Sequence, residues 1–323
     1  MLMAALAVII DSSCAFNQIN HGVAKRTTLS ASQTNTETDL QPVRKVAVVG
    51  SGICGLSLAH ALSQSKDIEI DIFDSRAELD EKSGSGIQLT GGMAALREIS
   101  PELQRHVADA SLPLERVVSR CRPWFGDSKE SWKLLEMDIQ QGIKSGVEDL
   151  ITNDGEVLAY TILRGTLQRL LHEELMKDHN IQVQFGKRLS GLDYSDSDSG
   201  ISLQFADGGS TGPYDLVVGC DGIKSVVKDF VNTGKTSSDG VDNKGSSPAI
   251  YSGIRITFAI QEGDENEDDP SGAQFTQFFG NGAYALTSVY GAGKGKPVAK
   301  GAFLIYGESR YVFFIFQLFC ILI

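Results

Sequence analysis

The chain has 323 residues and a formal net charge of −12 at pH 7, with 41% hydrophobic and 22% charged residues. This length is enough for a large hydrophobic core, and we expect two closely joined domains. The composition is typical of a soluble globular protein. The excess of negative charge argues against a nucleic-acid-binding surface.

Residues 1–43 are predicted to be a disordered leader that resembles a signal or transit sequence. The apolar stretch Leu2–Ile10 is too short to span a bilayer, and the small residues that follow it would suit a signal peptidase. Residues 16–36 contain no acid and are rich in Ser, Thr and Asn, as in a transit peptide. We expect the leader to direct import into a plastid. The alternative is a disordered leader that carries no targeting signal.

The first motif after the leader is an apolar strand that runs into Gly-x-Gly-x-x-Gly. In such a motif Gly50 would permit the tight turn, Gly52 would let a pyrophosphate approach the backbone, and Gly55 would let the next helix pack closely. That helix, over Leu56–Leu62, would direct its first N–H groups toward the phosphates. The predicted dinucleotide loop also includes Ser51, Ile53 and Cys54.

A second strand, Ile68–Phe73, ends at Asp74, about twenty residues after the glycines, where an acid that binds ribose is expected. Ser75 and Arg76 follow it. A single glycine motif is a weak signal, but strand, glycines, helix, strand and acid in this order are specific. The alternative is a glycine-rich turn that binds no ligand.

The middle of the chain alternates between helical and strand patterns. Gly92–Val107 is predicted to be a helix broken near Pro101, and Arg164 is predicted to begin a helix with a leucine stripe. Short strands and glycine turns follow, which predicts an antiparallel meander over Leu189–Tyr194 and Ile201–Phe205, with a turn at Ser195–Gly200 between them.

After the meander, Tyr214–Val227 reads Tyr-Asp-Leu-Val-Val-Gly-Cys-Asp-Gly-Ile-Lys-Ser-Val-Val. This run resembles the Asp-Gly motif of the FAD-dependent (class A) monooxygenases, the family of aromatic-ring hydroxylases and zeaxanthin epoxidases. The resemblance covers roughly Lys45–Val227, with the segments in the family's order. It implies an α/β fold in which a Rossmann-like FAD-binding domain of the glutathione-reductase type is joined to an antiparallel β-sheet substrate domain.

The resemblance also implies roles for single residues. Asp74 would bind the adenosine ribose of FAD with Arg76 beside it, and Arg164 would contact the cofactor. Asp221 and Gly222 would touch FAD and shape the route for NAD(P)H. The complete predicted cofactor site consists of Gly50, Ser51, Gly52, Ile53, Cys54, Gly55, Asp74, Ser75, Arg76, Gly86, Ile87, Arg164, Asp221 and Gly222.

These assignments divide the chain into segments. Residues 44–110 and 156–230 would form the two parts of the FAD-binding domain, and 111–155 would be an insertion facing the substrate domain. Residues 231–310 contain several stretches that alternate in hydrophobicity and would form the antiparallel substrate-binding sheet.

The apolar tail 311–323 is too short for a membrane span. The family continues here with a Gly-Asp motif that this chain lacks. We therefore expect the chain to be truncated at its C-terminus and the tail to be a gene-model artefact.

The predicted function is an FAD-dependent monooxygenase that uses NAD(P)H to insert one atom of O2 into an aromatic or isoprenoid small molecule, although this shortened chain would be a poor enzyme. Two alternatives stay open: a flavoprotein reductase or dehydrogenase of the same fold, and a non-catalytic FAD-binding protein.

The five cysteines form no metal-binding or disulfide pattern, and Cys54 and Cys220 are expected to be core residues. We assign no catalytic base, metal site or integral membrane span, and leave the substrate and the oligomeric state open.

Overall fold

The computed structural model of the protein describes residues 42–80, 84–122, 131–144, 151, 155–178, 180–194, 200–234, 250–264, 272–280 and 283–307. Several sequence predictions fall outside these ranges. They are the predicted leader up to residue 41, the turn at 195–199 and the apolar tail 311–323.

The predicted dinucleotide-binding segments form a parallel sheet of four strands in the order β11-β1-β2-β7. Its central strands are almost wholly buried, as expected for a parallel sheet covered on both faces. In the register, Val49 at the end of β1 lies between Phe73 and Gly219. The carboxyl ends of three strands therefore meet at one edge of the sheet. The strands are β1 (Lys45–Val49), β2 (Glu69–Phe73), β7 (Ile181–Gln184) and β11 (Leu216–Gly219).

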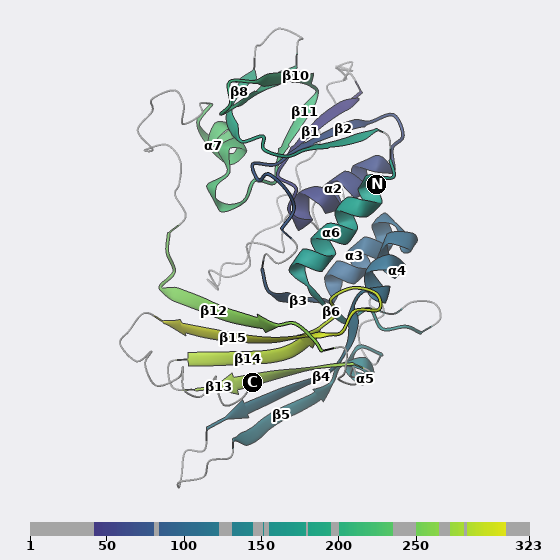
Figure 1. Cartoon of the computed structure of the whole chain (residues 1–323), viewed down its shortest axis with the longest axis vertical. Helices are drawn as coiled ribbons and strands as arrows, with labels where there is room; N and C mark the ends of the chain where they lie inside the picture. The colour runs from purple at the N-terminus through teal and green to yellow at the C-terminus, as the bar shows by residue number, and fades with distance from the viewer. Residues whose placement is uncertain are drawn as a thin grey trace, which may run out of the picture.

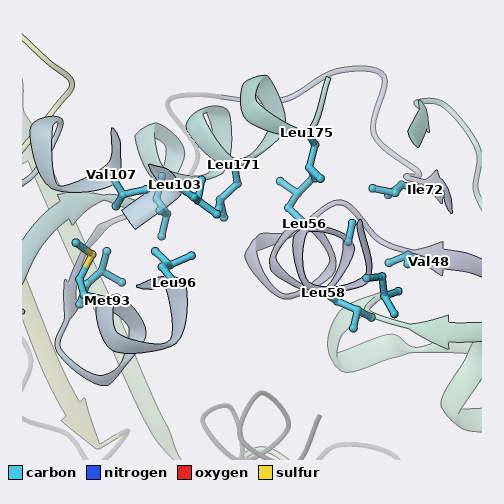
Figure 2. Packing of buried hydrophobic residues seen from close by; sticks show 14 of the residues in the cluster. Val48, Leu56, Leu58, Ile72, Met93, Leu96, Leu103, Val107, Leu171 and Leu175 are labelled. Carbon is cyan, nitrogen blue, oxygen red and sulfur yellow. The ribbon is translucent and has the colours of Figure 1, made fainter. Parts of the chain in front are cut away.

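Helices α2 (Ile53–Ser63) and α6 (Arg164–Leu175) cover one face of this sheet (Figure 1). The predicted break at Pro101 is confirmed, because α3 (Gly91–Ile99) ends before it and α4 (Pro101–Asp109) begins at it. The helices and the sheet share one apolar core (Figure 2). Its members include Val48, Leu56, Ile72, Met93, Leu103, Leu171 and Leu175.

The opposite face of the parallel sheet is covered by a three-stranded antiparallel meander and by α7 (Val226–Thr233). The sequence predicted this meander. Its core joins Phe73 of β2 to Phe205, with ring centroids 5.1 Å apart. The buried hydroxyl of Tyr214 donates a hydrogen bond of 2.7 Å to Asp71, which ties the meander to β2. The strands are β8 (Leu189–Tyr194), β9 (Ile201–Phe205) and β10 (Ser210–Tyr214).

A second sheet of eight strands lies on the far side of the helices (Figure 1). It is larger than the predicted sheet over 231–310, because four earlier strands join it. It is also not purely antiparallel, since β13 and β4 pair in parallel, with Thr276 opposite Val118. The eight strands are β3 (Gly86–Leu89), β4 (Leu112–Cys121), β5 (Trp132–Asp138), β6 (Tyr160–Leu163), β12 (Ile254–Gln261), β13 (Ala273–Phe279), β14 (Ala283–Tyr290) and β15 (Ala299–Gly307).

Two glycines make room for one large side chain in this second sheet. The ring of Tyr290 is 1% exposed, and a Cβ added at Gly86 or at Gly301 would overlap it. Short elements complete the described structure, namely α5 (Ile139–Lys144) and the single turn η3 (Gly222–Lys224). No helix in the described ranges is both long enough and apolar enough to cross a membrane.

Candidate cofactor site

The turn between β1 and α2 depends on two glycines for steric reasons. Gly50 has φ +106°, and its N–H donates a hydrogen bond of 2.7 Å to the carbonyl of Phe73. A Cβ at Gly50 would overlap the carbonyl oxygen of Cys220, and one at Gly55 would overlap that of Gly50. The predicted reasons for these two glycines, a tight turn and close helix packing, are therefore confirmed.

Gly52 is different, because its surroundings are open. A Cβ added there would meet no atom within 4 Å. The residue caps α2 with φ −68°, and the first N–H groups of a helix have no carbonyl partner inside it. These groups and the positive end of the helix dipole favour an anion. A pyrophosphate therefore fits at this point.

Asp74, at the carboxyl end of β2, is the most densely hydrogen-bonded acid of the site. Its Oδ2 accepts from the N–H and the hydroxyl of Ser51 at 2.8 and 2.7 Å. Arg76 donates three more bonds, from its backbone N–H at 2.8 Å, from Nε at 3.0 Å and from Nη2 at 2.9 Å. Burial alone would raise the pKa of Asp74, but the bonds from Arg76 and Ser51 outweigh it and hold that pKa well below its ordinary value.

The two oxygens of Asp74 are therefore already engaged. A ribose hydroxyl that bound to this carboxylate would take the place of one of the present donors, because a carboxylate offers about four lone-pair positions. Ser75 is exposed and only adjoins the network. The structure thus gives Ser51 and Arg76 a definite task, which is to fix the acid at the edge of the sheet.

The Asp-Gly run after β11 reaches the same edge. The N–H of Cys220 donates to the carbonyl of Val49 at 2.7 Å, which places the next residue, Asp221, beside the glycine turn. Oδ2 of Asp221 accepts from the N–H of Val226 at 2.7 Å, whereas Oδ1 is buried and has no hydrogen-bond partner. A buried unpaired oxygen costs free energy, so a hydroxyl or N–H of a bound ligand would stabilise it.

Arg164 begins α6 and lies against the chain that enters β3. Its N–H donates to the carbonyl of Ser85 at 2.9 Å, and its side chain contacts Gly84, which has φ +95°. Gly86 packs on the Tyr290 ring, and Ile87 packs against the main core. The structure thus gives the predicted residues Gly86 and Ile87 a packing role.

Gln168 is a site residue that the sequence analysis missed. It lies one turn after Arg164 on α6, is 1% exposed, and donates from Nε2 to the carbonyl of Ser51 at 2.6 Å. Its Oε1 is buried and has no partner. The available signal was a polar residue at helical spacing from Leu171 and Leu175 on the buried face of the helix.

The two cysteines of the site are close neighbours. Cys54, in the first turn of α2, is exposed, so the prediction that it is a core residue is wrong. Cys220 is partly buried and packs against the main core. Their Sγ atoms lie 3.8 Å apart, although the residues are 166 positions apart in the sequence.

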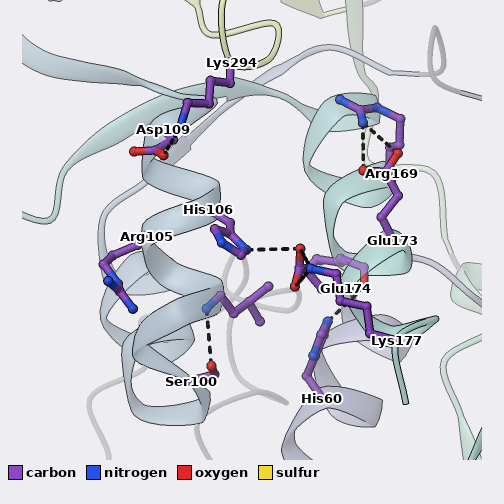
Figure 3. A network of polar contacts seen from close by, with 12 residues as sticks. His60, Ser100, Arg105, His106, Asp109, Arg169, Glu173, Glu174, Lys177 and Lys294 are labelled. Atoms are coloured by element: carbon purple, nitrogen blue, oxygen red, sulfur yellow. Dashed lines mark hydrogen bonds and ion pairs between the residues drawn. The ribbon is translucent and has the colours of Figure 1, made fainter. Parts of the chain in front are cut away.

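A separate hollow of about 400 Å³ lies between α4, α6 and the loop before β15. Figure 3 shows its ion pairs: Lys294 with Asp109 at 2.8 Å, and Arg169 with Glu173 at 2.8 Å. None of the predicted cofactor-site residues lines this hollow. Its lining consists of His106, Asp109, Ala110, Arg169, Leu170, Glu174, Gly293, Lys294 and Lys296.

Comparison with known proteins identifies the family. The FAD binding domain family matches residues 44–256, which is more than half of the chain. A 6-methylsalicylate 1-monooxygenase of Aspergillus terreus is 30% identical over 196 residues, covering 57% of this chain and 38% of that protein. An FAD-dependent monooxygenase of Monascus ruber is 28% identical over 218 residues, covering 64% and 42%. The chain thus spans about two fifths of the length of these curated relatives.

Solved structures share the fold at low sequence identity. CtdE, in complex with FAD and a substrate, has a TM-score of 0.60 at 15% identity, covering 84% of this chain and 58% of that one. The 2,6-dihydroxypyridine-3-hydroxylase of Arthrobacter nicotinovorans has a TM-score of 0.57 at 16% identity, with the same coverage of 84% and 58%. With the FAD binding domain matching most of the chain and its curated relatives being FAD-dependent monooxygenases, the protein belongs to the FAD-dependent (class A) monooxygenase family.

Proposed function

We propose that this chain binds FAD at the β1 turn and functions in a monooxygenase. The enzyme would insert one atom of O2 into an aromatic substrate, with NAD(P)H as electron donor. One observation carries the proposal. The glycine turn, Asp74 and Asp221 come from distant parts of the sequence and meet at one edge of the parallel sheet. In open parallel sheets, ligands bind outside this edge.

The residues of the site divide the work of binding. The open backbone at Gly52 and the first turn of α2 would receive the pyrophosphate. Arg76 and Ser51 hold the Asp74 carboxylate in place for a ribose hydroxyl, and the unpaired Oδ1 of Asp221 would accept a hydrogen bond from the cofactor. Bound flavin would supply the electron transfer and the chemistry of oxygen. The protein would hold the flavin in the required orientation.

An aromatic substrate is favoured over an isoprenoid by the names of the relatives. They include the 6-methylsalicylate 1-monooxygenase and, at 28% identity, an FAD-dependent urate hydroxylase of Mycolicibacterium vanbaalenii. Family membership supports NAD(P)H as the electron donor. Oxygen uptake with one hydroxylated product per NAD(P)H oxidised would support a monooxygenase, whereas substrate reduction without oxygen uptake would support a reductase.

A single substitution tests the cofactor site. Gly52→Val should leave the fold intact, because the position is open, and should lower FAD affinity at least tenfold by blocking approach to the backbone. Gly142→Val in α5 is the matched control, since a Cβ there also meets no atom within 4 Å. Flavin fluorescence titration measures both. Unchanged FAD affinity in folded Gly52→Val protein would contradict the proposal.

We also propose that the leader directs the protein to a plastid, on the basis of its composition. A fluorescent protein fused to residues 1–43 should enter plastids of a suitable algal host and lose the leader. A cytosolic, uncleaved fusion would contradict this proposal without bearing on the FAD site.

A further inference from the structure

We propose that Cys54 and Cys220 are a redox-active pair that hydrogen peroxide converts to a reversible disulfide across the cofactor turn. This inference does not depend on the proposed function, because it concerns two side chains of the protein itself.

The geometry brings the two sulfurs together. Sγ of Cys54 and Sγ of Cys220 lie 3.8 Å apart, and a disulfide requires about 2.05 Å. The sulfurs must therefore approach by about 1.8 Å, which rotation of both side chains about Cα–Cβ can largely supply. The two backbone segments are already in contact, since the N–H of Cys220 donates a hydrogen bond of 2.7 Å to the carbonyl of Val49 at the start of the glycine turn.

The two thiols differ in reactivity. Cys54 is exposed and lies in the first turn of α2, where the helix dipole favours a thiolate. The hydrogen bond from the Cys220 thiol outweighs partial burial and lowers the pKa of Cys54 to about 6. The same contact and burial raise the pKa of Cys220. Cys54 is therefore the nucleophile, and Cys220 is the resolving thiol.

The chemistry balances with peroxide as the oxidant. The Cys54 thiolate attacks one peroxide oxygen, so that an S–O bond forms, the O–O bond breaks and hydroxide leaves to become water. The Cys220 sulfur then gives up its proton and attacks Sγ of Cys54, forming the S–S bond as the second oxygen leaves as water. Two thiols lose two electrons in total, and one peroxide is reduced to two waters. A dithiol reductant reverses the change.

The position of this bond gives it a structural consequence. It would join the first turn of α2, beside the open backbone of Gly52, to the strand end that carries Asp221. Two parts of the cofactor site that are now held by packing and hydrogen bonds would become covalently linked.

Mass spectrometry of the full chain tests the proposal. Reduced protein is treated with hydrogen peroxide, alkylated with N-ethylmaleimide and digested without reductant. The expected result is one linked peptide pair containing residues 54 and 220, loss of two free thiols, and full recovery with dithiothreitol. Cys54→Ser and Cys220→Ser should each abolish that pair. The double variant Cys14→Ser/Cys320→Ser is the control and should keep it.

A second measurement avoids dependence on variants that fail to fold. In native wild-type protein, limiting iodoacetamide should label Cys54 before the buried Cys121 and should prevent later formation of the linked pair. Cys54 and Cys220 recovered as free thiols after peroxide, or Cys54 linked to another cysteine, would overturn the proposal.

Discussion

The central strands of the parallel sheet and the edge strand β12 of the second sheet are buried to very different degrees. β1 and β2 of the parallel sheet are buried at four of five positions each. In β12 of the second sheet, by contrast, Ile254, Ile256 and Phe258 are 54%, 57% and 47% exposed. The central strands β1 and β2, covered by helices on one face and by the meander on the other, are packed on both sides. We expect mutations to cost most in the core that these strands share with the helices, and least on β12.

The largest effect should come from the helix layer. Leu171→Ala removes a fully buried side chain of α6 from the main core and should cost about 3 kcal/mol of unfolding free energy. Ile256→Ala on β12 is the control and should change it by less than about 0.5 kcal/mol. Urea denaturation followed by circular dichroism measures both. Equal losses of unfolding free energy would mean that the helix layer and strand β12 do not differ in packing.

Asp74→Asn should cost about 2 kcal/mol, because it removes a buried charge that accepts bonds from Ser51 and Arg76. Since the folded pKa lies below the unfolded value of about 3.9, the charge stabilises the fold above that pH. This stabilisation is lost as the pH falls through the folded pKa. Wild-type protein should therefore lose more stability than the variant on acidification below about pH 4. Asp207→Asn, at an exposed ion pair, should have a much smaller effect.

Gly86→Ala should cost about 2 kcal/mol, because the new methyl group would overlap the buried ring of Tyr290. A double-mutant cycle separates packing from cofactor binding at this predicted site residue. In Gly86→Ala/Tyr290→Leu, the smaller side chain at position 290 should relieve the overlap. The double variant should therefore lose less unfolding free energy than the sum of the losses in the two single variants. Additive losses of stability would argue against the steric reason.

Tyr214→Phe should have the smallest effect, about 1 kcal/mol, from the loss of its hydrogen bond to Asp71. Tyr194→Phe, at a tyrosine that is 58% exposed, is the control and should leave the unfolding free energy almost unchanged. Thermal denaturation at one fixed pH measures the stability of both variants. A loss in Tyr214→Phe no greater than that in the control would contradict a stabilising role for this bond.

Local patterns predicted the parts of the site that depend on local geometry. The glycine turn, the strand that ends at Asp74 and the break at Pro101 are all as expected, because each depends on a few neighbouring residues. Pairings over long distances were harder to predict. The parallel contact of β13 with β4 and the neighbouring positions of Cys54 and Cys220 arise only when distant segments meet. Helical spacing could have pointed to Gln168, whereas the five bonds on Asp74 required side-chain positions that no pattern contains.

The strand order has a consequence during synthesis on the ribosome. β1 is central, and Val46 pairs with Ile70 on one side but with Leu216 on the other. At about 5 to 20 residues per second, translation from Val46 to Leu216 takes roughly ten to thirty seconds. For that interval one edge of β1 has no native partner in the nascent chain. The edge of the sheet that forms the cofactor site is therefore completed late. Until then, a chaperone that binds apolar strands could cover the unpaired edge of β1.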